Sequence, residues 1–252
     1  MNAAARTRAA MPRIPAPRAP AGTSIQGTVR STPAVAYQRV VHRMFRREFR
    51  LLGDLALWAS ADDTDHAAEI VRHADLMSRV LLQHHAIERD LLWPALFRSL
   101  PASQHDATRA IMTDWTTRAA ALDSTARDLG TAARQWTVAG TSRARDAFVS
   151  VCGRVADAVD VHTAAEEADL LPLLGAYLAD GDWAAIRRSA RNPFTGSEQM
   201  LVLGLALEDA CALDRARLLA GLHSSARTAW HVVGHRNFHA AVVRLRGAPP
   251  AL

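Results

Sequence analysis

The chain has 252 residues, of which 49% are apolar and only 6% aromatic, so it is long enough to bury a core without disulfides. Much of the apolar fraction is Ala and Leu, which favours helices over strands. The formal net charge of +5 comes from the two ends, because all 25 acidic residues lie between positions 31 and 214. Basic ends without interleaved aromatic residues or a nucleic-acid motif predict solvated surface, so we expect no nucleic-acid partner.

Residues 1–32 combine several prolines with Gly and Ser and hold few large apolar residues, which predicts a disordered basic tail. Apolar residues then recur at helical spacing, and Ser, Thr, Asp or Gly marks the turns between the runs. These signals predict four long helices over about 34–60, 64–97, 101–131 and 140–179. The short connections between them favour an antiparallel up-down four-helix bundle over residues 33–180.

After Gly181 the amphipathic pieces become shorter and are interrupted by Asn192-Pro193, Gly196 and Gly221. A last helix is predicted from about 224 to 246, where Gly247 and two prolines end it. We expect residues 181–247 to form a helical cap on the bundle, so the predicted fold class is all-α, a bundle with a C-terminal helical extension.

Three features bear on the compartment. The longest apolar run, over residues 200–207, is far shorter than the roughly 20 residues of a membrane span. The N-terminal segment lacks the apolar stretch of a secretory signal. Cys152 and Cys211 stand alone, which is typical of small buried residues in a reducing compartment. We therefore expect a cytoplasmic protein without a membrane partner.

The strongest pattern is a repeat between the second and fourth predicted helices. His84-x-x-x-Glu88-x-x-x-Leu-x-Pro-x-Leu recurs 78 residues later as His162-x-x-x-Glu166-x-x-x-Leu-x-Pro-x-Leu. Residues i and i+4 of a helix differ by about 40° in direction and about 6 Å along the axis, so each pair projects from one face. Two facing helices would then present two imidazoles and two carboxylates to one interior point.

This donor set suits iron or manganese, since carboxylates supply charge and imidazoles supply borderline nitrogen ligands. A single His-x-x-x-Glu would more often be a solvated surface pair. The repeated motif is flanked by Leu81, Leu92 and Leu96, which indicates that the stripe faces the core. Burying an unpaired carboxylate is costly, and a metal ion removes that cost.

Other residues near the motifs are further candidates. His42 lies among apolar residues of the first helix and is the best additional ligand, although a core histidine bonded to a backbone carbonyl is the alternative. Glu167 could replace Glu166. His85 points about 100° away from His84, so we expect it beside the site or on the surface. His73 lies three turns before His84, about 16 Å away, too far to share a metal.

These residues resemble the hemerythrin-like, or HHE cation-binding, proteins. The likeness rests on His42, on His84-His85-x-x-Glu88 followed by Leu-Leu-Trp-Pro, and on His162-x-x-x-Glu166-Glu167 followed by Leu-Leu-Pro. It covers about residues 34–180, and the C-terminal third looks like an extension of actinobacterial members. The resemblance implies that the matching residues bind two iron ions that take up or reduce O₂, with roles that extend to peroxide and nitric oxide chemistry.

One departure from the family pattern concerns the third helix, which should supply one or two histidines. No histidine occurs between His105 and His162, and the matching stretch offers Asp114 and Trp115. The last predicted helix instead carries histidines at 231, 235 and 239. Our hypothesis is that His231 and His235 complete the metal site, and the alternative is a solvated histidine face or Asp114 as ligand.

A site with fewer imidazoles than an oxygen carrier favours O₂ activation over release. The predicted function is therefore that of a non-heme protein with two Fe ions, or Mn, acting as an oxidase or oxygenase on an unidentified small molecule with O₂ or a related oxidant. A non-catalytic sensor of O₂, NO, peroxide or iron is the alternative, and a bundle with a vestigial motif is the third. No nucleophile triad, phosphate loop or dinucleotide fingerprint is present in the sequence.

Overall fold

The computed structural model describes residues 31–60 and 63–250, so most of the predicted tail lies outside the described residues. The described chain is helical, which confirms the all-α fold class. Its elements in chain order are α1 Pro33–Trp58, α2 Thr64–Ile87, a π-helical turn Glu88–Leu92, α3 Trp93–Ser99, a 3₁₀ turn Ala102–Gln104, α4 His105–Ala139, α5 Ser142–Tyr177, α6 Asp180–Ser189, α7 Gly196–Glu208, α8 Ala212–Ala220, α9 Ser224–Ala229, a π-helical turn Trp230–Gly234 and α10 His235–Arg246.

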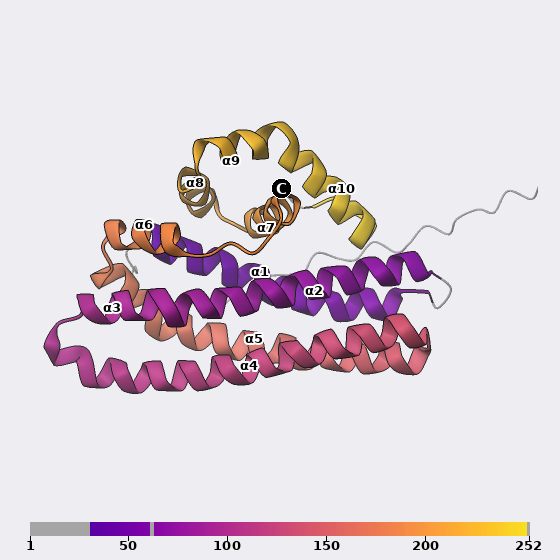
Figure 1. The fold of residues 1–252 in the computed structure, drawn as a ribbon, viewed down its shortest axis with the longest axis horizontal. Helices are drawn as coiled ribbons and strands as arrows, with labels where there is room; N and C mark the ends of the chain where they lie inside the picture. The colour runs from indigo at the N-terminus through magenta and orange to yellow at the C-terminus, as the bar shows by residue number, and fades with distance from the viewer. Residues whose placement is uncertain (1–30, 61–62, 251–252) are drawn as a thin grey trace, which may run out of the picture.

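Helices α1, α2 with α3, α4 and α5 form an elongated bundle, and the shorter helices α6 to α10 lie along one side of it (Figure 1). Within the bundle α5 packs between α1 and α4, while α2 contacts both α1 and α4. The cap touches the bundle mainly through α7 and α8 on α1 and through α10 on α2. The four long helices therefore enclose the interior of the bundle, and the cap covers it from one side.

The helix ends follow from local capping. Thr32, Asp63 and Thr141 each accept a hydrogen bond from a backbone N–H in the first turn of α1, α2 and α5, which satisfies donors that the helix itself leaves unpaired. Helix α4 ends at Gly140 in the left-handed region, with φ of 59°, a conformation that glycine adopts without steric cost. The predicted end near residue 131 was wrong, because Leu129, Ala132, Ala133 and Trp136 are buried and hold the helix through two more turns.

The bundle interior is divided into two apolar clusters by a polar layer. One cluster holds the end of α1 near residue 59, the start of α5 near residue 148 and the apolar face of the cap. The other surrounds α3 and includes Trp115, the C-terminal part of α5 and Leu178. Between them lie the buried side chains of the two repeated motifs, together with His42 and Gln38. Polar groups at such a depth need partners.

The helix predicted over 64–97 is interrupted by a π-helical turn that begins at Glu88. Such single-turn bulges insert one extra residue per turn and are frequent at functional sites. Pro94, which lacks a backbone N–H, follows directly. The last predicted helix, 224–246, contains a second π-helical turn at Trp230–Gly234.

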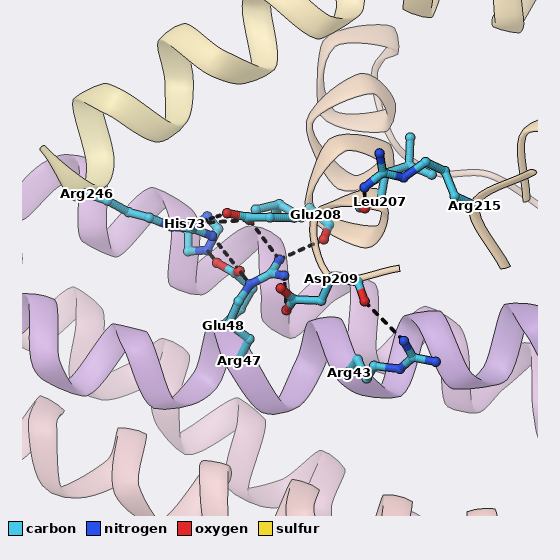
Figure 2. A network of polar contacts seen from close by, with 10 residues as sticks. Arg43, Arg47, Glu48, His73, Leu207, Glu208, Asp209, Arg215 and Arg246 are labelled. Carbon is cyan, nitrogen blue, oxygen red and sulfur yellow. Dashed lines mark hydrogen bonds and ion pairs between the residues drawn. The ribbon is translucent and has the colours of Figure 1, made fainter. Parts of the chain in front are cut away.

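A buried ionic network joins the cap to the bundle (Figure 2). The carboxylate of Glu48 on α1 is fully buried and accepts hydrogen bonds from Arg47 at 2.6 Å, Arg246 of α10 at 2.7 Å and His73 of α2 at 2.8 Å. Arg246 also donates to Glu208 of α7 at 2.8 Å. Burial raises the pKa of Glu48, but Arg47, His73 and Arg246 outweigh it and hold that pKa well below its usual range.

Two smaller findings bear on the predicted compartment. No helix of the described residues is both long and apolar enough to cross a lipid bilayer. Cys152 is buried as expected, and burial raises the pKa of its thiol to about 12. Cys211 is exposed, so the expectation that both cysteines are buried was wrong; its sulfur accepts the N–H of Asp214 at the start of α8.

Helix α7 meets α10 at Gly204, where an added Cβ would lie 2.2 Å from the ring of Phe238. We expect Gly204→Ala to lower the free energy of unfolding by about 1–3 kcal/mol through overpacking. Gly153→Ala is the matched control, because a Cβ there meets nothing within 4 Å and should stabilise helix α5 by about 0.5–1 kcal/mol. Urea denaturation of both variants measures the difference, and equal effects would contradict the close packing of α7 on α10.

Candidate metal centre

Six potential ligands meet in the polar layer of the bundle. They are His42 of α1, His84 and His85 of α2, Glu88 at the following π-helical turn, and His162 and Glu166 of α5. All six are between 0% and 3% exposed. The His-x-x-x-Glu spacing works as predicted in each motif, since the imidazole and carboxylate lie 3.2 Å apart in the first and 3.4 Å apart in the second.

The ligand atoms form two groups that share one carboxylate. His42, His84, Glu88 and Glu166 make one group, and His85, Glu88 and His162 make the other. Within each group the donor atoms all lie within 4.8 Å of one another, a spacing compatible with one ion at bond lengths of about 2 Å. Glu88 belongs to both, so its two oxygens are suited to bridging two cations.

The layer has the chemistry of a metal site because its donor atoms lack other partners. Among the described residues, nine ligand atoms here are buried without a hydrogen bond: His42 Nε2, both ring nitrogens of His84 and of His162, His85 Nε2, Glu88 Oε2 and both carboxylate oxygens of Glu166. Each such atom costs about 1–3 kcal/mol when it is left unpaired. Cations would satisfy one ring nitrogen of each imidazole and the unpartnered carboxylate oxygens, so the residues present fit a metal.

The two buried carboxyl groups of the layer, Glu88 and Glu166, have shifted pKa values in the absence of a cation. Burial raises the pKa of Glu88, but the imidazoles of His84, His85 and His42 outweigh it and lower that pKa to about 2. Burial and the negative charge of Glu88 raise the pKa of Glu166 to about 7. Burial lowers the pKa of His162. A bound cation would stabilise both carboxylates as anions, so metal binding releases the proton held by Glu166.

Two of the four histidines are oriented by a carboxylate on the ring nitrogen that faces away from the centre. His42 Nδ1 lies 3.2 Å from Glu167 Oε1, and Glu167 in turn pairs with Arg46 at 3.0 Å. His85 Nδ1 lies 2.5 Å from Asp123 Oδ1 of α4. A carboxylate that accepts this N–H fixes the ring and makes the opposite nitrogen a stronger ligand.

The geometry favours Glu166 over Glu167 as the candidate metal ligand. Glu166 faces the other ligands and is fully buried, whereas the Glu167 side chain is 28% exposed and contacts the outer nitrogen of His42. Gln38, one helical turn before His42, donates from Nε2 to Glu88 Oε1 at 2.6 Å. Sequence reasoning missed Gln38, although Gln38-x-x-x-His42 has the same spacing as the two motifs.

Residues 34–174 match the profile of the hemerythrin HHE cation-binding domain family. This range is more than half of the chain. The chain belongs to this family. No curated protein and no solved structure matches the chain. The protein therefore belongs to a cation-binding family, and its clustered His and Glu side chains make the polar layer the candidate metal site.

The histidines of the last helix do not reach this site. His231 and His235 are exposed, and neither belongs to a ligand group among the described residues. Helix α10 turns Phe238, Val242 and Leu245 toward the rest of the protein, whereas His235 stays exposed beside the ring of Trp230, with ring centres 5.9 Å apart. The hypothesis that His231 and His235 complete the centre of the hemerythrin-like bundle is therefore corrected by the structure.

The third long helix, α4, supplies neither Asp114 as a ligand nor any histidine to the candidate centre. Asp114 of α4 is exposed and pairs with Arg118 at 2.7 Å, and Trp115 packs against Trp93 with ring centres 6.0 Å apart. Instead, α4 contributes Asp123, whose carboxylate contacts His85. The sequence could have indicated this role, because Asp123 is an acidic residue next to the buried positions Ala119, Leu122 and Ala126.

The expectation that His85 lies beside the site or on the surface was not met: His85 is 2% exposed and belongs to a ligand group, because α2 packs against both α1 and α4. His84 lies near His42 of α1, with ring centres 5.7 Å apart, and His85 lies near His162 of α5, with ring centres 5.1 Å apart. A bundle helix buries a face at least about 100° wide, so two consecutive residues can both point inward. The candidate centre consequently brings together four imidazoles, none of which comes from α4.

Replacing Asp123 with Asn is expected to weaken metal binding in the His85 group by about 10- to 100-fold, because His85 loses the anion that orients it. Asp128→Asn is the matched control, since Asp128 is an exposed residue of the same helix. Titration of the apoprotein with Fe(II) under anaerobic conditions measures both affinities. Unchanged binding in Asp123→Asn would show that this carboxylate does not support a ligand.

Proposed function

We propose that the protein holds two iron ions, one at each of the two ligand groups that share Glu88, and activates O₂ as an oxidase or oxygenase acting on a small molecule. The observation that carries this proposal is the pair of ligand groups with one shared carboxylate in a sealed layer of unpartnered donor atoms. A di-iron pair supplies electrons for the reduction of O₂ when it is bound. The protein supplies the ligands, their protonation states and the exclusion of water.

The charge around the layer supports O₂ reduction more than reversible O₂ carriage. Glu88 and Glu166 face the ions, and Glu167 and Asp123 make His42 and His85 stronger donors. Negative charge stabilises the more oxidised and more positive form of an ion. Oxidised iron is therefore favoured, whereas an oxygen carrier must return to the reduced form each time.

A specific observation favours a second candidate, a sensor of O₂, NO or peroxide. All six ligands are at most 3% exposed, and such a layer admits a diatomic gas or peroxide more easily than an organic substrate. In that case the ions would respond to a small oxidant without an organic substrate. Manganese in place of iron would suit the same donors.

Anaerobic loading with Fe(II) followed by exposure to O₂ tests these alternatives. Rapid and irreversible oxidation, followed by an absorption spectrum, is expected for an O₂-activating centre. A persistent oxygenated species that is lost on degassing would favour a carrier or sensor. Failure of the chain to retain iron after desalting would contradict both proposals and would leave a bundle with a vestigial motif.

A further inference from the structure

Three histidines at the end of the chain take no part in the candidate metal centre. His231, His235 and His239 follow one another at intervals of four residues, and all three are exposed. Within the described part of the chain, none of the three forms a hydrogen bond or pairs with an acidic side chain. Their ring nitrogens are therefore available to a ligand from solution.

His235 and His239 form the better pair of the three, because both lie in the regular α-helix α10. Residues i and i+4 of an α-helix lie one above the other, with Cβ atoms about 5–6 Å apart. Two histidines at this spacing can bind a single ion, as in the helical zinc motifs of metalloproteases. His231 belongs to the preceding π-helical turn, whose wider i to i+5 hydrogen bonding takes it out of this register.

The surface around this pair leaves room for an ion. Both histidines line one depression, and every residue that lines it comes from positions 232–240, so no other helix covers the pair. The ring of His235 meets the buried ring of Trp230 edge to face, with ring centres 5.9 Å apart. This contact restricts the rotation of His235, which reduces the side-chain entropy that binding has to remove.

The donor set of the depression selects the kind of ion. Of the described residues that line it, none is acidic, so Mg²⁺ and Ca²⁺ would lack the oxygen ligands that they require. Imidazole suits Zn²⁺, Cu²⁺ and Ni²⁺, and the affinity of a nitrogen site is greatest for Cu²⁺. The neighbouring Arg236 repels any cation, but it is exposed, so water and salt screen its charge. The ion with the greatest affinity for imidazole is therefore favoured.

We propose that His235 and His239 form a separate metal site on the cap, which binds Cu²⁺ and, more weakly, Ni²⁺ or Zn²⁺. The two imidazoles supply two ligands, and water from the solvent completes the coordination of the ion. An ion held by side chains one turn apart also stabilises that turn of α10. This inference goes beyond the proposed function and does not depend on iron in the central layer.

Retention of the full chain, without an affinity tag, on a resin whose chelated Ni²⁺ keeps two coordination positions open tests the pair. At about pH 8 an unperturbed imidazole is neutral and can bind. The resin reports surface histidines alone, because the six ligands of the central layer are at most 3% exposed. The wild type should be retained, and His239→Gln should elute at a lower imidazole concentration, since losing one of two linked ligands weakens attachment by about tenfold or more. In equilibrium dialysis against Cu²⁺, the wild type should bind one more ion per chain than His239→Gln.

A relocated histidine provides the matched control. The double variant His239→Gln with Ala240→His keeps the number of exposed histidines, because Ala240 is exposed, but it turns the second imidazole about 140° away from His235. This double variant should elute with His239→Gln, whereas His231→Gln should elute with the wild type. Equal retention of the wild type and the double variant, a loss in His231→Gln as large as that in His239→Gln, or equal Cu²⁺ content of the wild type and His239→Gln would each overturn the proposal.

Discussion

Replacing Glu88 with glutamine is expected to abolish metal binding at both ligand groups. Glu88 is the one residue common to the two ligand groups found in the described chain, and an amide provides neither the charge nor the bridging geometry of a carboxylate. The loss of affinity should be about 100-fold or more at each position, larger than that for a residue that merely orients a ligand. Metal analysis after Fe(II) loading and desalting measures the stoichiometry.

A substitution in only one ligand group provides a comparison for the metal content of Glu88→Gln. His162→Asn should lose mainly the ion of the His85 group, because His162 belongs to that group alone. Asp75→Asn, at an exposed position of α2, should leave metal binding at both groups unchanged. Circular dichroism of Glu88→Gln should remain helical, since the substitution removes a buried charge and preserves the shape of the side chain. Full iron content in Glu88→Gln would refute the shared-ligand arrangement.

Metal removal is expected to lower the melting temperature of the wild-type protein by about 10 °C. The physical reason is that the metal-free layer leaves nine buried ligand atoms unpaired. Ligand binding to the native state alone, at a free concentration of about 1,000 times Kd, stabilises a protein by about 4 kcal/mol. For a chain of this size each kcal/mol shifts the melting temperature by about 2–4 °C.

Thermal unfolding of the double variant Glu88→Gln with Glu166→Gln tests whether the change in melting temperature comes from metal bound at this layer. Its melting temperature should be independent of added Fe(II), and it should exceed that of the metal-free wild type, because two buried carboxyl groups have become neutral amides. Arg154→Gln, on the exposed face of α5, serves as the surface control. An equal response of the double variant and the wild type to Fe(II) would place the stabilising ion elsewhere in the protein.

The fold was predictable from sequence because its signals are local. Helical spacing of apolar residues and the turn at residues 140–142 locate the long helices, and the all-α prediction and the family are confirmed. The ends of helices were less predictable. Helix α4 continues past residue 131 because its last turns are stabilised by buried contacts with α5. Such contacts between distant segments cannot be recognised from the local sequence.

The site was only partly predictable for the same reason. The repeated spacing identifies His84, Glu88, His162 and Glu166, and His42 stands out as a histidine among apolar residues; the structure brings these five together. The spacing of the histidines at 231 and 235 is equally regular, yet they are exposed. Spacing shows that side chains share a helix face, but it does not show which partner covers that face.

The sequence by itself thus determined the two His-x-x-x-Glu faces and the helices that carry them, because an α-helix places residues i and i+4 on one side whatever surrounds it. Only the tertiary structure decided the remainder of the centre. The contact of α2 with both α1 and α4 turns His85 inward onto Asp123 and makes Glu88 common to both ligand groups. These relations join residues 38 positions apart or more, and they exist only once the four helices have packed.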